Sequence, residues 1–275
     1  MPPIGSRSHP AVSRFRETRD GRDDQAIFVE GRRLLEELLD SSVSPREAAV
    51  TPAAAKDPRN APLVETLQSR GATVHIVTPF VMEFLSDLDC PPGLAVRADK
   101  PQPFDIKSLC ALNPPSPLFV LLDALQSPAN VGAILRSAEA AGVTAVGLLP
   151  NTADPLSPKA LRASAGGAFR VPLFFLDSAQ TLQSAFGDRL SFFAADAGGP
   201  RSYEGVDWSQ PSVLLLGGEA RGVAPLTLGS LSVEKVRIPM AGRVESLNVA
   251  VAAGILLMEA RRQRTSRDSS SSALT

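Results

Sequence analysis

Ser246-Leu247-Asn248 opens the last long apolar helical pattern of the chain, and it is the third of three short polar segments in an otherwise aliphatic C-terminal half. The other two are Ser127-Pro128-Ala129-Asn130, with Arg136 further on, and Gly217-Gly218-Glu219. Each segment follows a strand-length run rich in Leu, Val and Ile and precedes a helical pattern, so we expect all three at the carboxyl ends of strands. Open α/β sheets bind their ligands at those ends, and the pattern therefore predicts one shared site.

The apolar runs around these segments predict a mainly parallel sheet. They are continuous rather than alternating, which is typical of strands covered on both faces. With helices between several of them, they indicate a doubly wound α/β domain over residues 118–262, followed by a frayed tail at 263–275. The expected strands are 118–122, 145–149, 171–176, 190–194, 213–216 and 235–238, and the first expected helix is 131–141.

Residues 1–98 predict a basic N-terminal arm and a second, smaller α/β domain. Strands are expected at 26–29, 48–50 and 74–77, with amphipathic helices between them. His75 lies inside the last of these strands, and we interpret it as structural. Residues 99–117 contain five prolines, which disfavour both helices and central strands, so this stretch is predicted to be the domain linker.

The composition is that of an ordinary globular protein. The chain has 275 residues, of which 44% are hydrophobic and 21% charged. The longest apolar stretch, 247–258, falls short of the roughly 20 residues that cross a bilayer, and the N-terminus lacks the apolar core of a secretory signal. We therefore expect a cytoplasmic protein without a membrane partner.

The charge balance excludes binding of a polyanion by the whole surface, because 28 basic residues face 29 acidic ones. Nucleic-acid binding would have to come from local clusters. Each cluster also fits an ordinary solvated surface, and that alternative stays open for all three. It is strengthened for the first cluster, because acidic residues are interleaved with its arginines. The clusters are Arg14, Arg16, Arg19 and Arg22; Lys159, Arg162 and Arg170; and Arg261, Arg262, Arg264 and Arg267.

Metal and nucleotide-cofactor sites are disfavoured. The chain has only two cysteines, without C-x-x-C spacing, and two histidines, so neither a disulfide framework nor a metal site is expected. The segment Gly217–Gly222 does not fit G-x-G-x-x-G, and no G-x-x-x-x-G-K-[ST] occurs. A dinucleotide-dependent oxidoreductase stays open as an alternative, although the chain lacks the phosphate-binding loop of that class.

The polar segments also have simpler explanations. Asn130 and Ser246 are both good helix N-caps, and paired glycines serve chain reversal. Arg136 stands in a predicted helix whose other residues are mostly small or apolar, so its side chain is either exposed or bound to a phosphate. The planar guanidinium of arginine suits a phosphate. Three such coincidences at three strand ends favour the functional interpretation.

Three motifs carry a resemblance to a known family. They are residues 122–138 (LDALQSPANVGAILRSA), 215–222 (LLGGEARG) and 238–250 (IPMAGRVESLNVA). With 158–167 (PKALRASAGG), they resemble the SpoU or TrmH family of RNA ribose 2′-O-methyltransferases in the SPOUT superfamily. Residues 28–31 (FVEG) and the Arg-rich helix after them are similar to the RNA-binding module of that family. Ser127 stands where many members have Asp, and Ser can make the same turn.

The resemblance implies a SPOUT-like fold, with a trefoil knot in the C-terminal domain and a smaller N-terminal RNA-binding domain. It implies S-adenosylmethionine as the methyl donor, no metal, and a homodimer whose active site takes residues from both subunits. The implied reaction centre is Asn130, Arg136, Glu219, Ser246 and Asn248. The implied donor-binding residues are Leu216, Gly217, Gly218, Ile238, Met240, Ser246 and Leu247. The implied RNA-binding residues are Arg14, Arg16, Arg32, Arg33, Lys159 and Arg162.

The implied activity is methyl transfer to a ribose 2′-hydroxyl of structured RNA. Ribosomal RNA is the expected substrate, and the sequence itself does not separate it from transfer RNA. Two alternatives stay open: a transfer RNA ribose methyltransferase, and an RNA-binding assembly or resistance factor that keeps the fold without the chemistry.

Overall fold

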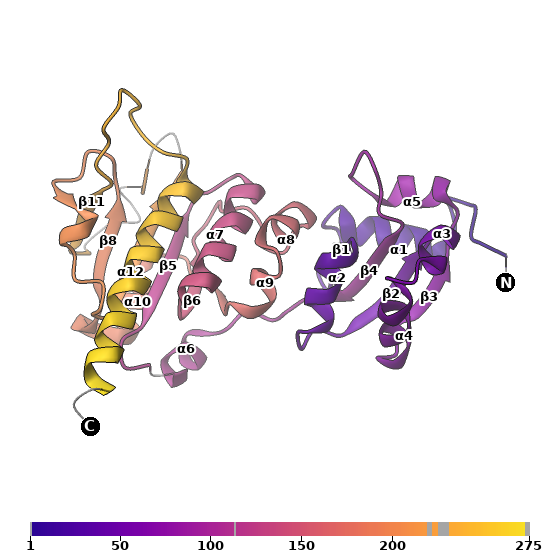
Figure 1. Cartoon of the computed structure of the whole chain (residues 1–275), viewed down its shortest axis with the longest axis horizontal. Helices are drawn as coiled ribbons and strands as arrows, with labels where there is room; N and C mark the ends of the chain where they lie inside the picture. The colour runs from indigo at the N-terminus through magenta and orange to yellow at the C-terminus, as the bar shows by residue number, and fades with distance from the viewer. Residues whose placement is uncertain (1, 113, 219–221, 225–230, 273–275) are drawn as a thin grey trace. The chain divides into compact units, whose positions relative to one another are not determined.

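The chain forms two compact units in a computed structural model that describes residues 2–112, 114–218, 222–224 and 231–272 (Figure 1). Unit 1 comprises residues 1–102 and 155–169, and unit 2 comprises residues 103–154 and 170–275. Segment 155–169, which the sequence analysis put in the 118–262 domain, therefore packs with unit 1. In the described part of the chain, no helix is long and apolar enough to cross a membrane.

Unit 1 is built on a four-stranded sheet in the order β1-β4-β2-β3. The strands are β1 (Ala26–Glu30), β2 (Pro45–Val50), β3 (Thr73–Ile76) and β4 (Leu94–Asp99). β4 pairs antiparallel with both β1 and β2, whereas β2 and β3 are parallel. β4 was not predicted from the sequence, although it lies inside the sheet. A charged residue, Arg97, interrupts its apolar run.

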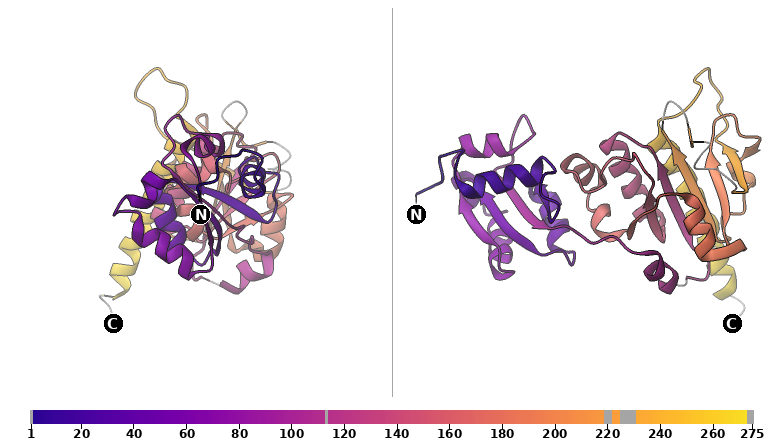
Figure 2. Two further views of the ribbon diagram at one scale, coloured as in Figure 1. Left: turned by 90° about the vertical axis from the view of Figure 1, so that its right-hand side faces the viewer. Right: turned by 180° about the vertical axis from the view of Figure 1, so that it is seen from behind.

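Helices cover both faces of this sheet. Figure 2 shows α1 lying across one face, where the edge-to-face pair Phe15–Phe28 and the side chain of Met82 join the core. The other face buries the predicted apolar side of α2, including Leu35 and Leu38. The helices are α1 (Pro10–Arg19), α2 (Arg32–Leu39), α3 (Pro52–Lys56), α4 (Ala61–Ser69), α5 (Pro79–Leu85) and α8 (Pro158–Ser164).

A buried charge network joins α1 to the sheet. The carboxylate of Glu47, 11% exposed, accepts a bidentate pair of hydrogen bonds from Arg14 at 2.8 and 2.6 Å, and a third hydrogen bond from Arg97. Arg97 also pairs with Asp23, and His75 Nε2 lies 3.0 Å from Glu47. The expectation that His75 is structural agrees with this placement. Burying charges is costly, so each member depends on its partners.

The network predicts an acid-sensitive unit 1. Burial alone would raise the pKa of Glu47, but hydrogen bonds from Arg14 and His75 and the charges of Arg14 and Arg97 lower it from 4.5 to about 2. A lowered carboxylate pKa stabilises the folded state above the unfolded pKa, and that contribution is lost as the pH falls through the folded pKa. We expect Glu47→Gln to lower the free energy of unfolding by about 3 kcal/mol at pH 7 and by only about 1 kcal/mol at pH 3, in urea denaturation.

Asp57 provides the matched control for Glu47→Gln. A hydrogen bond from Arg59 lowers its pKa to about 2 as well, but this pair lies at the surface. Surface pairs contribute little to stability, so Asp57→Asn should leave the free energy of unfolding nearly unchanged both at pH 7 and at pH 3. Equal effects of the two substitutions on the free energy of unfolding would show that burial of the Glu47 network does not cause the acid sensitivity.

Unit 2 contains a seven-stranded sheet in the order β7-β6-β5-β10-β8-β11-β9. All six neighbouring pairs are parallel, as the continuous apolar runs predicted. Each of the six expected strands is present, and its observed ends lie within two residues of the predicted ends. The strands are β5 (Leu118–Asp123), β6 (Ala145–Leu148), β7 (Leu173–Phe175), β8 (Ser191–Ala195), β9 (Arg201–Ser202), β10 (Ser212–Gly217) and β11 (Val233–Arg237).

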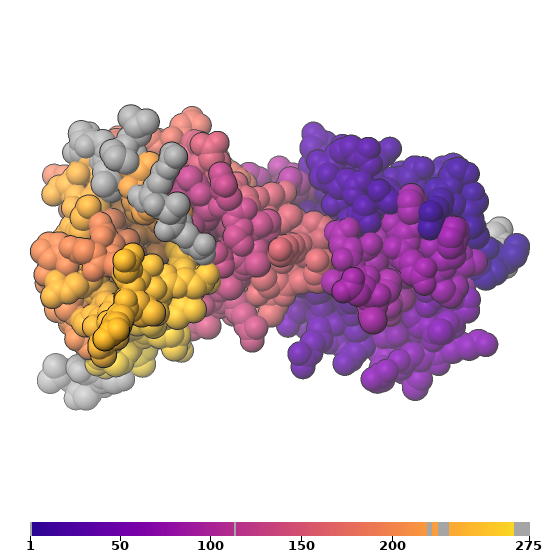
Figure 3. All heavy atoms as spheres, turned by 90° about the horizontal axis from the view of Figure 1, so that it is seen from above, coloured from indigo at the N-terminus to yellow at the C-terminus, as the bar shows by residue number. Residues whose placement is uncertain are grey.

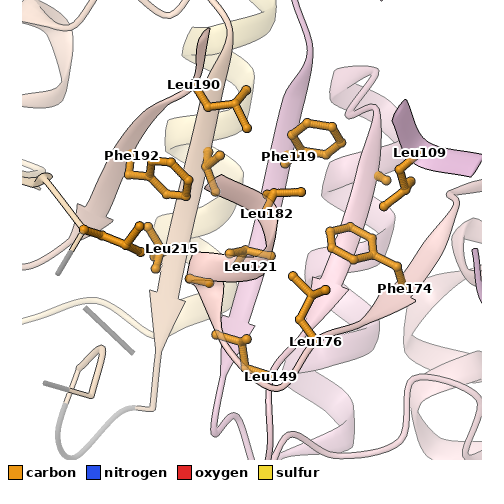
Figure 4. Packing of buried hydrophobic residues seen from close by; sticks show 14 of the residues in the cluster. Leu109, Phe119, Leu121, Leu149, Phe174, Leu176, Leu182, Leu190, Phe192 and Leu215 are labelled. Atoms are coloured by element: carbon orange, nitrogen blue, oxygen red, sulfur yellow. The ribbon is translucent and has the colours of Figure 1, made fainter. Parts of the chain in front are cut away.

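Helices cover this sheet as well. α7 (Pro128–Ala141) and α12 (Val249–Ser272) pack on each other along one face, and α7 buries the predicted stripe Ile134, Leu135 and Ala138. On the other face, α6 (Ile106–Leu112) and α10 (Ala179–Phe186) join the sheet in an aromatic and aliphatic core (Figure 4). Unit 2 also contains two short 3-10 turns, η1 (Gly187–Arg189) and η2 (Tyr203–Gly205), and the short helix α9 (Gly167–Arg170) lies where the chain passes from unit 1 back to unit 2.

The structure corrects two expectations near the ends of unit 2. The proline-rich stretch 99–117 contains α6, because the residues between its two groups of prolines include good helix formers and Leu109 is fully buried in the core. The final helix also continues past Gln263, where a frayed tail was predicted, as far as Ser272. Gln263 bonds the backbone of Val206 and Trp208, and Arg264 donates to the carbonyl of Gln210, which anchors this turn.

Candidate active site

A cavity of about 570 Å³ lies where several parallel strands of unit 2 end. Because β8, β10 and β11 run in the same direction, their carboxyl ends meet at one edge of the sheet. Residues that follow these ends form the wall, together with the first turns of α12. The lining residues are Ala195, Asp196, Ala197, Leu216, Gly217, Gly218, Gly222, Val236, Ile238, Met240, Ser246, Leu247, Asn248, Val249, Ala252 and Leu256.

All seven residues that the resemblance assigns to the donor line this one cavity. They come from three places in the sequence: the end of β10, the loop after β11, and the segment that leads into α12. The structure therefore brings together the second and third polar segments, as expected from their position after strands. The seven are Leu216, Gly217, Gly218, Ile238, Met240, Ser246 and Leu247.

Three glycines, Gly217, Gly218 and Gly222, form one wall. The N–H of Gly222 donates to the carbonyl of Gly218 at 2.8 Å, so these two residues lie against each other at the end of β10. A Cβ on Gly217 would lie 2.0–2.1 Å from backbone atoms of Gly222 and Val223, so only glycine fits there. The chain just after Gly222 is also tied to β5, because the 4% exposed Asp123 accepts a 2.7 Å hydrogen bond from the N–H of Ala224.

The first and third polar segments meet through an amide pair. Asn248 Nδ2 donates to Asn130 Oδ1 at 3.2 Å. Neither alternative N-cap explanation holds: Ser127 caps α7 by accepting from the N–H of Asn130, and Asn248 accepts from the first N–H groups of α12. Capping therefore does not account for Asn130 or Ser246. Asn130 itself is not among the residues that line the cavity.

Two other predicted members of the reaction centre, unlike Asn130, have no described contact with a residue that lines the cavity. Arg136 is exposed on α7, does not line the cavity, and makes no hydrogen bond or ion pair within the described ranges. Its guanidinium is therefore available to another molecule. Glu219 lies outside the described residues.

The cavity contains one carboxylate that the sequence analysis overlooked. Asp196 follows β8 directly and pairs with Lys235 at 2.9 Å. The hydrogen bond from Lys235 lowers the pKa of Asp196, and the backbone N–H of Gly198 adds to this effect, so the group is charged near neutral pH. A strand-length run followed by Asp-Ala-Gly-Gly is the same kind of signal as the other three segments and would have identified it.

The six predicted RNA-binding residues differ in their availability. Arg33 and Lys159 are exposed, whereas Arg14 is held by Glu47 and Arg32 pairs with Glu36 at 2.7 Å. Arg162 lies 4.0 Å from the carboxylate of Glu30, whose pKa is raised by burial. Arg16 lies over the Phe84 ring and donates to the carbonyl of that residue. These six residues all belong to unit 1.

No group of three or more His, Cys, Asp or Glu side chains with the spacing of a metal site occurs in the described part of the chain. Among the described residues, the cavity lining offers backbone groups, apolar side chains, the hydroxyl of Ser246, the amide of Asn248 and the carboxylate of Asp196. Such a lining suits an organic cation with an aromatic base and a sugar.

Comparisons with known proteins give the class and the family. Residues 28–104 match the family described as RNA 2′-O ribose methyltransferase substrate binding, and residues 117–258 match the SpoU rRNA Methylase family. Fold and site thus define an RNA ribose 2′-O-methyltransferase that uses S-adenosylmethionine. The chain belongs to the SpoU rRNA methylase family.

Individual relatives extend over most of the chain. An uncharacterized tRNA/rRNA methyltransferase of Synechocystis sp. is 31% identical over 95% of this chain and 94% of its own length. The 23S rRNA (guanosine-2′-O-)-methyltransferase of Xylella fastidiosa is 34% identical over 78% and 87%, respectively. The crystal structure of an AdoMet-bound rRNA methyltransferase from Sinorhizobium meliloti has a TM-score of 0.78 at 28% identity, covering 95% of this chain and 97% of that one.

Proposed function

We propose that the protein methylates the ribose 2′-hydroxyl of a nucleotide in structured ribosomal RNA, with S-adenosylmethionine held in the cavity at the carboxyl edge of the unit 2 sheet. The observation that carries this proposal is the convergence of the donor-binding residues on that cavity, next to the Asn130–Asn248 pair. With ribosomal RNA as substrate, the protein is expected to work in the cytoplasm.

The cavity fits the donor. Gly217 and Gly218 bring only backbone groups to the cavity wall, and the backbone of Gly222 and Val223 fills the space that a side chain at Gly217 would need. Ile238, Met240 and Leu247 offer an apolar wall for the adenine base. The charged Asp196 suits the cationic end of the donor or its ribose hydroxyls.

The protein groups around the donor would position the acceptor. S-adenosylmethionine supplies an electrophilic methyl on a cationic sulfur. Asn130, Ser246 and Asn248 would hold the acceptor 2′-hydroxyl for its attack on that methyl. Arg136 is always protonated and cannot serve as a base. It orients the hydroxyl or the neighbouring phosphate, and the proton passes to that phosphate or to water.

We propose that two chains share each active site. Arg136 is exposed without a partner in the described residues, yet the resemblance assigns it to the reaction centre. The helix that packs beside it, α12, exposes Val251 (52%) and Met258 (50%) two turns apart, and Figure 3 shows this helix on the surface of unit 2. A two-fold dimer through α7 and α12 would cover these apolar groups and direct Arg136 of one chain to the cavity of the other. The trefoil knot likewise stays a prediction.

Asn130→Ala is expected to slow methyl transfer about tenfold or more while folding is retained, because one positioning hydrogen bond is lost. Ser127 caps α7, so the helix does not depend on Asn130. Single-turnover rates with saturating donor provide the measurement, and Gln68→Ala, at an exposed position of α4, is the amide control. An unchanged rate would remove Asn130 from the reaction centre.

The choice of RNA is tested by offering each pool separately. The purified protein is incubated with labelled S-adenosylmethionine and with 23S rRNA, 16S rRNA or total tRNA, all unmethylated at the relevant sites. We expect incorporation into ribosomal RNA. Incorporation into tRNA alone would support the tRNA alternative, and donor binding without incorporation into any pool would support the non-catalytic factor.

A further inference from the structure

An exposed arginine in unit 1 lies over two aromatic rings. The guanidinium carbon of Arg7 is 4.1 Å from the ring centroid of Phe80 and 4.6 Å from that of Phe84, both on α5. Phe80 is 52% exposed, which is unusual for a large aromatic side chain. Arg7, Phe80 and Phe84 together form what we call the Arg7 patch.

The backbone on both sides of Arg7 is fixed. Ile4 extends the sheet of unit 1: its N–H donates to Ile76 at 2.8 Å, and its carbonyl accepts from Thr78 at 3.0 Å. Two residues after Arg7, His9 caps α1 by accepting from the N–H of Ala11. Arg7 thus lies in a short connection between two anchored points, which limits the conformational entropy lost when it binds a ligand.

The polar groups of Arg7 are not used by the protein. It makes no hydrogen bond or ion pair with any described residue, and its contacts are the two rings. The neighbouring arginines differ, since Arg16 and Arg19 both pair with Asp20 and donate to the carbonyl of Phe84. Arg7 therefore presents a stacked guanidinium with free donors beside an exposed ring.

We propose that the Arg7 patch binds one unpaired nucleotide of the RNA substrate, with the base stacked on the guanidinium or on Phe80 and a phosphate on the Arg7 N–H groups. This inference rests on the proposed RNA substrate. Unstacked bases are recognised on aromatic rings and guanidinium planes, whereas bases within a duplex are not accessible in this way.

The surrounding charges favour a single nucleotide over a longer stretch of backbone. Glu83 is exposed on the same helix, between Phe80 and Phe84 in sequence, whereas Asp87, which follows α5, pairs with Arg19 at 3.2 Å. The carboxylate of Glu83 would repel a run of phosphates. It leaves room for one phosphate at Arg7, whose charge is not neutralised by a carboxylate in the described residues.

The test is equilibrium binding of the full-length protein to two fluorescein-labelled RNA probes, a single-stranded octaadenylate and a fully paired duplex of equal length. We expect Phe80→Leu and Arg7→Ala each to weaken binding of the single strand about tenfold, because each removes part of the stacking on one base. Binding of the duplex should change less than about twofold. Phe80→Trp should retain binding, and its indole emission should be quenched by the single strand, whereas Trp208 is buried and contributes a constant background.

Matched controls separate stacking from charge and folding. Phe175→Leu removes an equally exposed ring (55%) from unit 2, and Arg70→Ala removes one exposed positive charge from unit 1. Urea denaturation of each variant checks that unit 1 stays folded. The proposal is overturned if Arg70→Ala weakens single-strand binding as much as Arg7→Ala, if Phe80→Leu has no effect, or if the wild-type protein binds neither probe.

Failure of this inference is distinguishable from failure of the proposed function. Wild-type protein that methylates ribosomal RNA, while Phe80→Leu leaves single-strand binding and methylation unchanged, would overturn the patch alone. Protein that binds neither S-adenosylmethionine nor ribosomal RNA would contradict the proposed function itself.

Discussion

Gly217→Ala is expected to abolish S-adenosylmethionine binding, with calorimetric affinity lowered on the order of 100-fold or below detection. The added Cβ would lie 2.0–2.1 Å from backbone atoms of Gly222 and Val223, and backbone cannot move aside without opening the loop. Overpacking against rigid neighbours costs about 1–3 kcal/mol or more, and here the strained element is the wall of the cavity. Methyl transfer should be lost with donor binding.

Gly242→Ala is the matched control, because a Cβ added at Gly242 would have no other atom within 4 Å and the residue stands in the neighbouring loop. Its donor affinity should equal that of the wild-type protein. Circular dichroism and thermal unfolding check that Gly217→Ala still folds, as expected because Gly217 is the last residue of β10. Normal donor affinity in a folded Gly217→Ala variant would remove Gly217 from the donor site.

Arg136→Ala is expected to lower the rate of methyl transfer about 100-fold or more without changing donor affinity, because one charge-placing group is lost from the transition state. Its side chain does not line the cavity, so donor binding should not depend on it. Arg136→Lys keeps the charge but not the planar fork and should recover only part of the rate. Weakened donor binding in Arg136→Ala would assign the residue a different role.

Mixed dimers test whether Arg136 acts across subunits. If Arg136 of one chain serves the cavity of the other, a dimer of one Arg136→Ala chain and one Gly217→Ala chain contains one complete active site. Random mixing makes about half of the dimers mixed, so about a quarter of the wild-type activity should return from two inactive proteins. No recovery in dimers shown to be mixed would place Arg136 within its own active site.

Much of the fold was predictable because its signals are local. Continuous apolar runs identified the six main strands of unit 2, and the stripe Ile134, Leu135 and Ala138 identified the buried side of α7. The polar segments after β10 and β11 marked the cavity, since residues at parallel strand ends share one edge. The hydrophobic pattern within each element was sufficient to predict its type and its buried side.

Other features depend on contacts that a sequence does not display. β4 was missed because buried Arg97 looks polar until its partners Glu47 and Asp23 are known. α6 was missed because prolines flank it, although Leu109 anchors it in the core. Asp123 holds a loop 101 residues away, and no local pattern indicates such a bond.

The position of the transferred methyl is the most direct test of the function proposed for this cavity. The protein is incubated with ribosomal RNA and methyl-labelled S-adenosylmethionine, and the RNA is then hydrolysed in alkali, which requires a free 2′-hydroxyl at each cleaved bond. We predict that the label appears in alkali-resistant dinucleotides and, after full digestion, in 2′-O-methylated nucleosides. Label in ordinary mononucleotides carrying a methylated base, or no label in any RNA, would contradict ribose methylation by this protein.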